Sequence, residues 1–311
     1  MLRRLDYKCH FCTKCEGFGC KGEMPGMGGP AESANFIENV AGWKRLVARF
    51  LDNPTEGQDD KMTSPDGGHN LPAIRLAPMT GAVENVGYHD ERSFYFDLII
   101  AACSAGINLS IGDGCPDEKL LFGIEAIKAA IHFFPQARAA VFIKPYENRR
   151  ILERMEWSQE VAEIYGVDID SYNIVTMRNK VNLEKKTASQ LRELKAATSL
   201  PFAIKGVFTE EDLKLVAELK PDIVVVSNHG GRIETRRGST ADFLLEHGAT
   251  LRSNCGQLWV DSGIRTCRDL LVAAKLGASQ VMVGRPVVTA LCQDGVRGVI
   301  HAMDKLKSPE N

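Results

Sequence analysis

Short apolar runs alternate with helical patterns from residue 73 onward, and this alternation limits the possible folds more than any other feature. The runs are largely apolar throughout, which is typical of parallel strands buried on both faces. Parallel strands joined by helices form either a closed (β/α)8 barrel or an open doubly wound sheet. Eight such units in about 240 residues favour the α/β class and the (β/α)8 TIM barrel. The predicted strands cover residues 73–77, 106–110, 139–143, 171–176, 201–205, 222–227, 257–261 and 279–283.

Helical periodicity separates these strands. An amphipathic helix is also predicted before them, at residues 35–51, and a polar loop rich in proline and glycine follows it. We therefore expect two parts, a cysteine-rich N-terminal extension with its helix at 1–70 and the barrel at 71–311. The helices predicted within the barrel cover residues 117–133, 149–165, 187–198, 209–219, 240–251, 266–276 and 287–304.

The overall composition is that of an ordinary soluble globular protein, with 44% hydrophobic and 25% charged residues among 311. A net charge of −2 gives no reason to expect nucleic acid or an anionic membrane as a partner. No apolar run is long enough to span a bilayer, and the first residues do not resemble a secretory signal. We therefore expect a cytoplasmic protein.

The most informative motif is Ser227-Asn228-His229-Gly230-Gly231-Arg232, which follows the apolar run 223–226. A histidine can accept a proton, and an arginine three residues later can bind an anion. The motif alone is equally typical of a strand-to-helix loop with a solvated histidine and arginine. Its place at the carboxyl end of a barrel strand, where barrel enzymes have their active sites, favours a catalytic pair.

Polar residues and glycines follow the other predicted strands at the same face of the barrel. Two of these segments, Asp261-Ser262-Gly263-Ile264-Arg265 and Gly284-Arg285-Pro286, each combine a tight turn at a helix start with an arginine. Barrels often bind phosphate in the loops after their last two strands, where backbone N–H groups point at the anion. The segments therefore predict a phosphate site.

Together, these motifs resemble the FMN-dependent α-hydroxy acid oxidases and dehydrogenases, such as glycolate oxidase and lactate oxidase. Residues that match the family are frequent over 200–292 and fewer over 73–176. Residues 1–60 do not resemble the family. It implies that the cofactor is FMN. The implied cofactor-binding residues are Ala77, Pro78, Met79, Ser110, Lys144, Thr176, Lys205, Ser227, Asp261, Gly263, Arg265, Gly284 and Arg285.

The resemblance also implies an activity, the oxidation of a 2-hydroxy acid by proton abstraction and hydride transfer to the flavin. His229 would be the general base, Arg232 the carboxylate anchor and Lys205 the cation beside the flavin. Tyr146 and Arg178 would join His229 and Arg232 in binding the substrate. Two alternatives stay open, an FMN-dependent isomerase of the type 2 isopentenyl diphosphate isomerase kind and a non-catalytic flavin and iron–sulfur electron-transfer protein.

Several residues depart from the family pattern. Lys144 stands where the family has a glutamine, and the family's aromatic residue after the second strand is absent. The family's Thr-Val-Asp after the fourth strand is expected to be missing, with Thr176-Met177-Arg178 in its place. We therefore expect a small carboxylate other than glycolate or lactate bound in the usual manner. The sequence leaves the electron acceptor and any homo-oligomeric state open.

Four of the nine cysteines, Cys9, Cys12, Cys15 and Cys20, lie within twelve residues. This spacing is close to the ferredoxin run in which three cysteines bind one iron–sulfur cubane. We therefore favour a [4Fe–4S] cluster, and a structural zinc site with four thiolates is the alternative. Disulfides are not expected in a reducing compartment.

Overall fold

A computed structural model describes residues 7, 33–53, 71–174, 180–233 and 235–309 of the chain. Parallel strands in the order β1-β8-β7-β6-β5-β4-β3-β2 form one sheet. Backbone hydrogen bonds between Asn108 and both Ile74 and Leu76 link the start of β2 to β1, so the sheet closes into a barrel. The strands are β1 (Ala73–Leu76), β2 (Leu109–Gly112), β3 (Ala139–Ile143), β4 (Ala162–Asp168), β5 (Phe202–Val207), β6 (Ile223–Val226), β7 (Gln257–Asp261) and β8 (Gln280–Val283).

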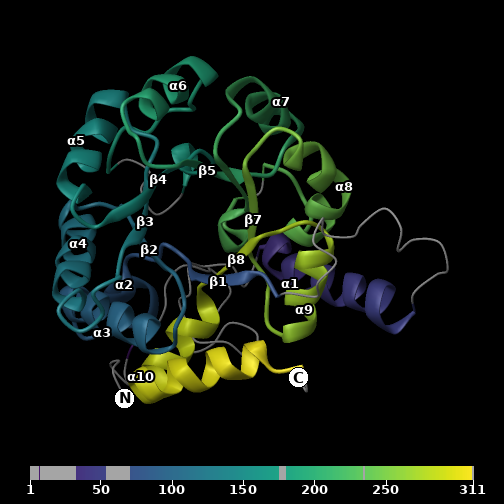
Figure 1. Ribbon diagram of the computed structural model, residues 1–311, viewed down its shortest axis with the longest axis horizontal. Helices are drawn as coiled ribbons and strands as arrows, with labels where there is room; N and C mark the ends of the chain where they lie inside the picture. Colours follow the sequence, from purple (N-terminus) through teal and green to yellow (C-terminus); the bar gives the residue numbers. More distant parts are fainter. Residues whose placement is uncertain (1–6, 8–32, 54–70, 175–179, 234, 310–311) are drawn as a thin grey trace.

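Helices surround the strands, as Figure 1 shows. Several begin at well-formed caps, and Thr187, Thr209 and Thr266 each make a capping box with the residue three positions later. No helix in the described part of the chain is long and apolar enough to cross a membrane. The helices are α1 (Ala34–Val47), α2 (Ala82–Val86), α3 (Glu91–Ser104), α4 (Glu118–Ala130), α5 (Asn148–Ser158), α6 (Ala188–Ala196), α7 (Glu210–Leu219), α8 (Thr240–Arg252), α9 (Cys267–Lys275) and α10 (Arg285–Lys307), with short helical turns η2 (Ala48–Asp52), η4 (Ser171–Asn173) and η6 (His229–Gly231).

The predicted barrel is confirmed, but the fourth strand was predicted in the wrong place. Residues 171–176 were expected to form it, whereas β4 is Ala162–Asp168 and pairs with β3 and β5. The helix predicted at 149–165 ends at Ser158. A short apolar run fits either helical or strand periodicity, and here pairing with two neighbouring strands decides. The structure also places β2 further along the chain than predicted and has α2 and α3 between β1 and β2, where no helix was predicted.

The interior of the barrel is filled with side chains. Phe142, Trp259 and Met282 are buried there, together with smaller residues from neighbouring strands. At the amino end of the strands, the buried guanidinium of Arg75 lies 4.8 Å from the Trp259 ring and pairs with Glu163 at 2.8 Å. Because the centre of the barrel is packed, a ligand can be bound only at its ends.

Helix α1 packs against the loops that follow β6 and β7 and lies next to α8 and α9 (Figure 1). Trp43 of α1 is buried, and its Nε1 donates a hydrogen bond to the carbonyl of Ser262 at 2.8 Å. A Cβ atom on Gly263 would lie 2.4 Å from the carbonyl oxygen of Asn39, so no larger residue fits there without movement. The backbone of helix α1 therefore lies in direct contact with the backbone at the carboxyl end of the barrel.

Candidate active site

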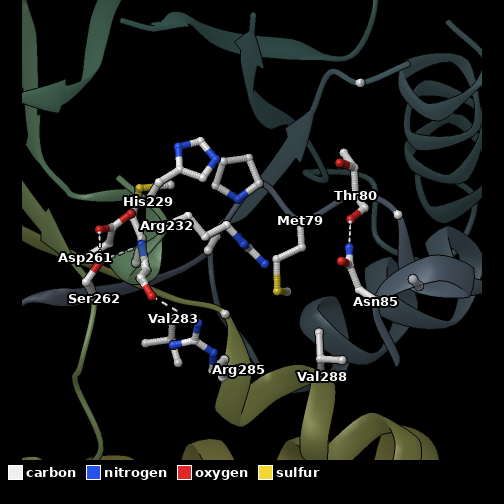
Figure 2. A pocket seen from close by; sticks show the side chains of 18 of the residues that line it. Met79, Thr80, Asn85, His229, Arg232, Asp261, Ser262, Val283, Arg285 and Val288 are labelled. Atoms are coloured by element: carbon white, nitrogen blue, oxygen red, sulfur yellow. Dashed lines mark hydrogen bonds between the residues drawn. The ribbon is translucent and has the colours of Figure 1, made fainter. Parts of the chain in front are cut away.

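A pocket lies at the carboxyl ends of the strands. Its cavity volume is about 180 Å³. Residues from β5 and from the loops after β1, β3, β6, β7 and β8 line it (Figure 2). The predicted site residues that line it are Ala77, Pro78, Met79, Lys144, Lys205, His229, Arg232, Asp261, Gly263, Arg265, Gly284 and Arg285.

Three other predicted site residues are described but do not line this pocket. Ser110, Tyr146 and Ser227 are buried. Ser227 Oγ accepts a hydrogen bond from the backbone N–H of His229 at 3.1 Å, so it supports the loop after β6. Thr176, Arg178, Cys9, Cys12, Cys15 and Cys20 lie outside the described residues.

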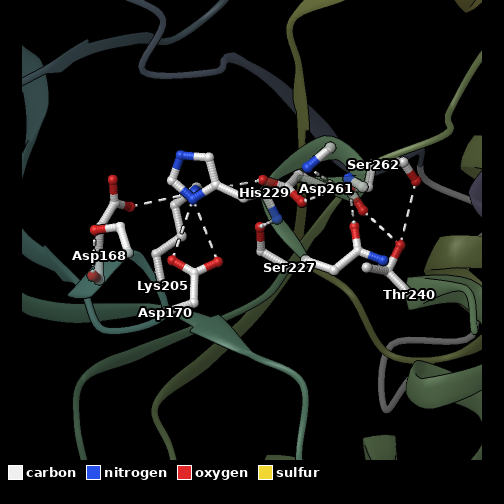
Figure 3. Close-up of polar contacts among 12 residues, drawn as sticks. Asp168, Asp170, Lys205, Ser227, His229, Thr240, Asp261 and Ser262 are labelled. Atoms are coloured by element: carbon white, nitrogen blue, oxygen red, sulfur yellow. Dashed lines mark hydrogen bonds and ion pairs between the residues drawn. The ribbon is translucent and has the colours of Figure 1, made fainter. Parts of the chain in front are cut away.

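Two buried lysines share one buried carboxylate beside the pocket. Lys144 Nζ donates to Asp168 Oδ2 at 2.6 Å, and Lys205 Nζ forms an ion-pair contact with Asp168 Oδ1 at 3.2 Å, without hydrogen-bond geometry. Lys205 Nζ also lies 3.8 Å from Asp261 Oδ2. Figure 3 shows Lys205 between the carboxylates of Asp168 and Asp261 and next to His229.

These contacts hold Lys205 and Asp168 in their charged forms. Burial alone would lower the pKa of Lys205, but Asp168 and Asp261 outweigh it and raise the pKa well above its usual range. Burial alone would raise the pKa of Asp168, and the ammonium groups of Lys144 and Lys205 outweigh it, so that pKa is lowered. The pocket therefore contains fixed positive charge at neutral pH.

His229 is held by a second carboxylate. Its Nδ1 lies 3.1 Å from Asp170 Oδ1, and Figure 3 shows the two side chains facing each other. Burial, together with the charges of Lys205 and Lys144, lowers the pKa of His229, although Asp170 opposes the change. A neutral imidazole whose Nδ1–H donates to Asp170 carries its lone pair on Nε2. His229 can therefore accept a proton there.

Asp168 and Asp170 were missed in the sequence analysis because the fourth strand was misplaced. With β4 ending at Asp168, Gly166-Val167-Asp168 stands at the strand end, where Thr176-Met177-Arg178 had been expected to follow it. Residues 176–178 do not directly follow the strand. The available signal was a pair of aspartates, spaced two residues apart, after the apolar residues 164–167.

Arg232 follows His229 on the same turn and extends across the pocket toward Met79 (Figure 2). Burial lowers its pKa to about 10, while the charge of Asp261 acts in the opposite direction. A guanidinium with this pKa stays charged at neutral pH and can bind a carboxylate with two hydrogen bonds.

The predicted phosphate end lies at the loops after β7 and β8. Helix α10 begins at Arg285, whose Nη2 donates to the carbonyl of Gly230 at 3.0 Å and whose guanidinium lies 4.3 Å from the ring of Phe36. The backbone turns sharply before Arg265, with positive φ at both Ser262 and Gly263. A helix start and two arginines make this end suitable for an anion.

A family model described as FMN-dependent dehydrogenase matches residues 127–309, more than half of the chain. The chain belongs to the FMN-dependent dehydrogenase family. The match includes β3 to β8 and therefore every lysine, histidine and arginine that the resemblance assigned to the site.

The chain is also similar to individual oxidases, over a shorter stretch of residues than the family model matches. 2-Hydroxyacid oxidase 2 of Bos taurus is 39% identical over 111 residues, which are 36% of this chain and 31% of that protein. 4-Hydroxymandelate oxidase of Amycolatopsis orientalis is 38% identical over 120 residues, 38% of this chain and 33% of that protein. The matched part thus spans about one third of the length of these relatives.

Solved structures match over most of the chain. Mandelate oxidase with benzoyl-formic acid has a TM-score of 0.65 at 24% identity and covers 90% of this chain and 84% of its own. Mandelate oxidase with (S)-2-phenylpropionate has a TM-score of 0.62 at 24% identity, over 88% of this chain and 82% of its own. At this identity the likeness establishes the barrel fold.

The pocket of this FMN-dependent family member fits its cofactor. Lys205 and Lys144 supply cations to one side of the pocket, and Arg265 and Arg285 supply them where a phosphate would bind. FMN would therefore be held by the loops after β1, β7 and β8 and by the lysines at the ends of β3 and β5.

Proposed function

We propose that this protein oxidises a 2-hydroxy acid with FMN as the cofactor. The observation that carries the proposal is the pairing of His229 with Asp170 at 3.1 Å, on the same pocket wall as Arg232. A base and a carboxylate anchor on one turn match the needs of a 2-hydroxy acid, which has a hydroxyl beside its carboxylate. The names of the matching relatives, 2-hydroxyacid oxidase and 4-hydroxymandelate oxidase, support the same class of substrate.

Each residue has one task in this proposal. Arg232 binds the substrate carboxylate and orients the α-carbon. His229 Nε2 accepts the hydroxyl proton, and Asp170 stabilises the imidazolium that forms. Lys205 offers positive charge where negative charge builds up during the reaction.

The atoms and electrons of the reaction balance with these groups. The O–H bond of the substrate breaks and its proton goes to His229. The α-carbon loses its hydrogen with two electrons, and its C–O bond becomes a C=O bond. When bound, FMN supplies the acceptor for that hydrogen and its electrons. An isomerase without net redox would need neither a carboxylate anchor nor a base that is paired in this way.

The substrate we propose is a 2-hydroxy acid, but not glycolate or lactate bound as in the known oxidases. Lys144 lines the pocket where the sequence resemblance expects a glutamine. Gly114, which also lines it, belongs to the segment Ile111-Gly112-Asp113-Gly114, where the resemblance expects an aromatic residue. The pocket wall therefore differs from the pattern of the known oxidases.

Anaerobic titration of the flavin-loaded protein with a panel of 2-hydroxy acids tests the proposal. The panel should contain small, aromatic and dicarboxylic members. We expect at least one of them to bleach the flavin absorption, with one 2-oxo acid formed per flavin reduced. Bleaching by dithionite but by none of the hydroxy acids would contradict the proposed activity.

We also propose, from the spacing of Cys9, Cys12, Cys15 and Cys20 alone, that this segment binds a [4Fe–4S] cluster. In the cytoplasm, where we propose that the protein works, the four cysteines would remain available as thiolates. Anaerobically purified protein is expected to contain about four irons and four sulfides per chain. The Cys12→Ser/Cys15→Ser variant should lose both while it retains FMN. Zinc without sulfide in the wild-type protein would make the segment a zinc site instead.

A further inference from the structure

The turn that carries His229 has a backbone conformation that needs support. His229 has a φ of +58°, which a residue with a side chain rarely adopts. Gly230 and Gly231, next along the turn, also have positive φ. Residues held in sparsely populated regions persist only where their surroundings determine the conformation. The contacts of this turn therefore decide where the imidazole points.

One set of contacts comes from the side chain of Asn228, directly before His229. Its Oδ1 accepts a hydrogen bond from the backbone N–H of Gly231 at 3.0 Å and so spans the turn. The Asn228 side chain is fully buried. A buried amide must find partners for both its oxygen and its nitrogen.

One residue of α1, Asn39, is far away in the sequence and partners both atoms of this amide. Asn39 Nδ2 donates to Asn228 Oδ1 at 2.8 Å, and Asn228 Nδ2 donates to Asn39 Oδ1 at 2.9 Å. Asn39 Oδ1 also accepts a hydrogen bond from the N–H of Thr240 at 3.1 Å, at the start of α8. The two amides thus form a reciprocal pair that fixes the orientation of each.

Helix α1 lies too close to the turn for this pair to be a loose contact. A Cβ atom on Gly231 would be 2.6 Å from the backbone nitrogen of Phe36. The residues matched by the family model begin at 127, so α1 and Asn39 lie outside that match. Within the matched segment, the Asn228 amide has two other partners, the N–H of Gly231 at 3.0 Å and the carbonyl of Gly238 at 3.4 Å, and both belong to the same loop.

We propose that Asn39 is a positioning residue, which acts through Asn228 to hold the 229–231 turn so that His229 faces Asp170. The proposal rests on the proposed function for its catalytic consequence, but the placement of the imidazole can be tested without any substrate. Helix α1 then forms part of the catalytic apparatus, in addition to covering the barrel.

The test compares Asn39→Ala with Arg45→Ala on the same helix. Arg45 is exposed, pairs with Asp242 at 2.6 Å and Glu38 at 3.1 Å, and makes no contact with the turn in the described structure, so it controls for weaker docking of α1. Both variants are prepared as full chains loaded with FMN. Flavin reduction by a reactive 2-hydroxy acid and thermal unfolding are measured for each.

We expect Asn39→Ala to lower the limiting rate constant of flavin reduction by about 10-fold or more, because a small misplacement of a catalytic group is costly. Arg45→Ala should reduce at the wild-type rate. Equal rates in the wild type and Asn39→Ala, or an equal loss in the two variants, would overturn the proposal. If Asn39→Ala does not fold, Asn39→Asp serves in its place, because it keeps the acceptor for Thr240 and replaces the donor to Asn228 with an anionic oxygen.

A second readout separates this proposal from the proposed function. The imidazole of His229 is titrated by NMR in the wild type and in Asn39→Ala, with His229→Asn used to assign its signal. The charged groups that face it are Asp168, Asp170, Lys144 and Lys205. When the turn relaxes and the ring becomes less buried, its pKa should rise toward the ordinary value of an imidazole. An unchanged titration would overturn the positioning role, whether or not any hydroxy acid reduces the flavin.

Discussion

Replacing His229 with asparagine is expected to lower the rate constant of flavin reduction by about 100- to 10,000-fold, the usual contribution of a general base. Asparagine can still donate a hydrogen bond to Asp170 but cannot accept the hydroxyl proton. Anaerobic stopped-flow absorption of the FMN-loaded variant measures the effect. Binding of a non-reactive carboxylate should change little, because Arg232 remains in place. Reduction at the wild-type rate would contradict the assigned base.

The pH dependence of the same reaction provides a control. The pKa of His229 is lowered by burial, and the imidazole must be neutral to accept a proton. The wild-type value of kcat/KM should therefore hold as pH falls past about 6.5, the ordinary pKa of histidine, and decline only below it. Asp170→Asn removes the carboxylate that opposes the lowering of the His229 pKa, so the decline of kcat/KM should move to still lower pH. Flavin reduction in this variant should be slower by about 10-fold or more. A decline centred above pH 6.5 in the wild type would contradict this assignment.

Replacing Lys205 with methionine is expected to have the largest combined effect on stability and redox behaviour. Lys205 lies 3.2 Å from Asp168 and 3.8 Å from Asp261, and all three side chains are buried. Removal of one partner from a buried ion pair typically costs about 3 to 5 kcal/mol, because it leaves an uncompensated buried charge. The free energy of unfolding of the FMN-loaded variant should fall by an amount in this range, as measured by denaturant titration.

The same variant should have a lower flavin reduction potential, because it lacks the cation that we propose stabilises the reduced form. A loss of about 1.4 kcal/mol corresponds to about 30 mV for two electrons, and equilibration with redox dyes measures the change. Lys144→Met should destabilise the protein less, because Lys144 pairs with Asp168 alone in the described structure, whereas Lys205 faces both Asp168 and Asp261. Lys185→Met removes only an exposed pair with Glu211 and should change neither quantity. A wild-type potential in Lys205→Met would exclude the proposed role of this cation.

The positions of the charged residues around Asp168 explain why sequence reasoning found only part of the site. Lys144, Lys205, His229 and Arg232 were all predicted, because the family resemblance names them and each lies at or just after the end of a strand that periodicity placed nearly correctly. Asp168 and Asp170 were not, because the helical pattern of α5 continues without a visible break into β4. Local periodicity cannot distinguish a helix end from a buried strand when the apolar residues fit both.

The sequence by itself determined the barrel, the face that carries the pocket and the turn after β6. Continuous apolar strands alternating with helices leave few arrangements, and parallel strands bring the residues that follow them to one face. Only the tertiary structure decided where β4 lies, which carboxylate contacts His229 and that Asn39 supports its turn. Those facts depend on hydrogen-bond partners that are distant in sequence, such as Asn39 and Asn228, which are 189 residues apart. Such a pairing leaves no local pattern, because it is selected by the packing of α1 on the closed barrel.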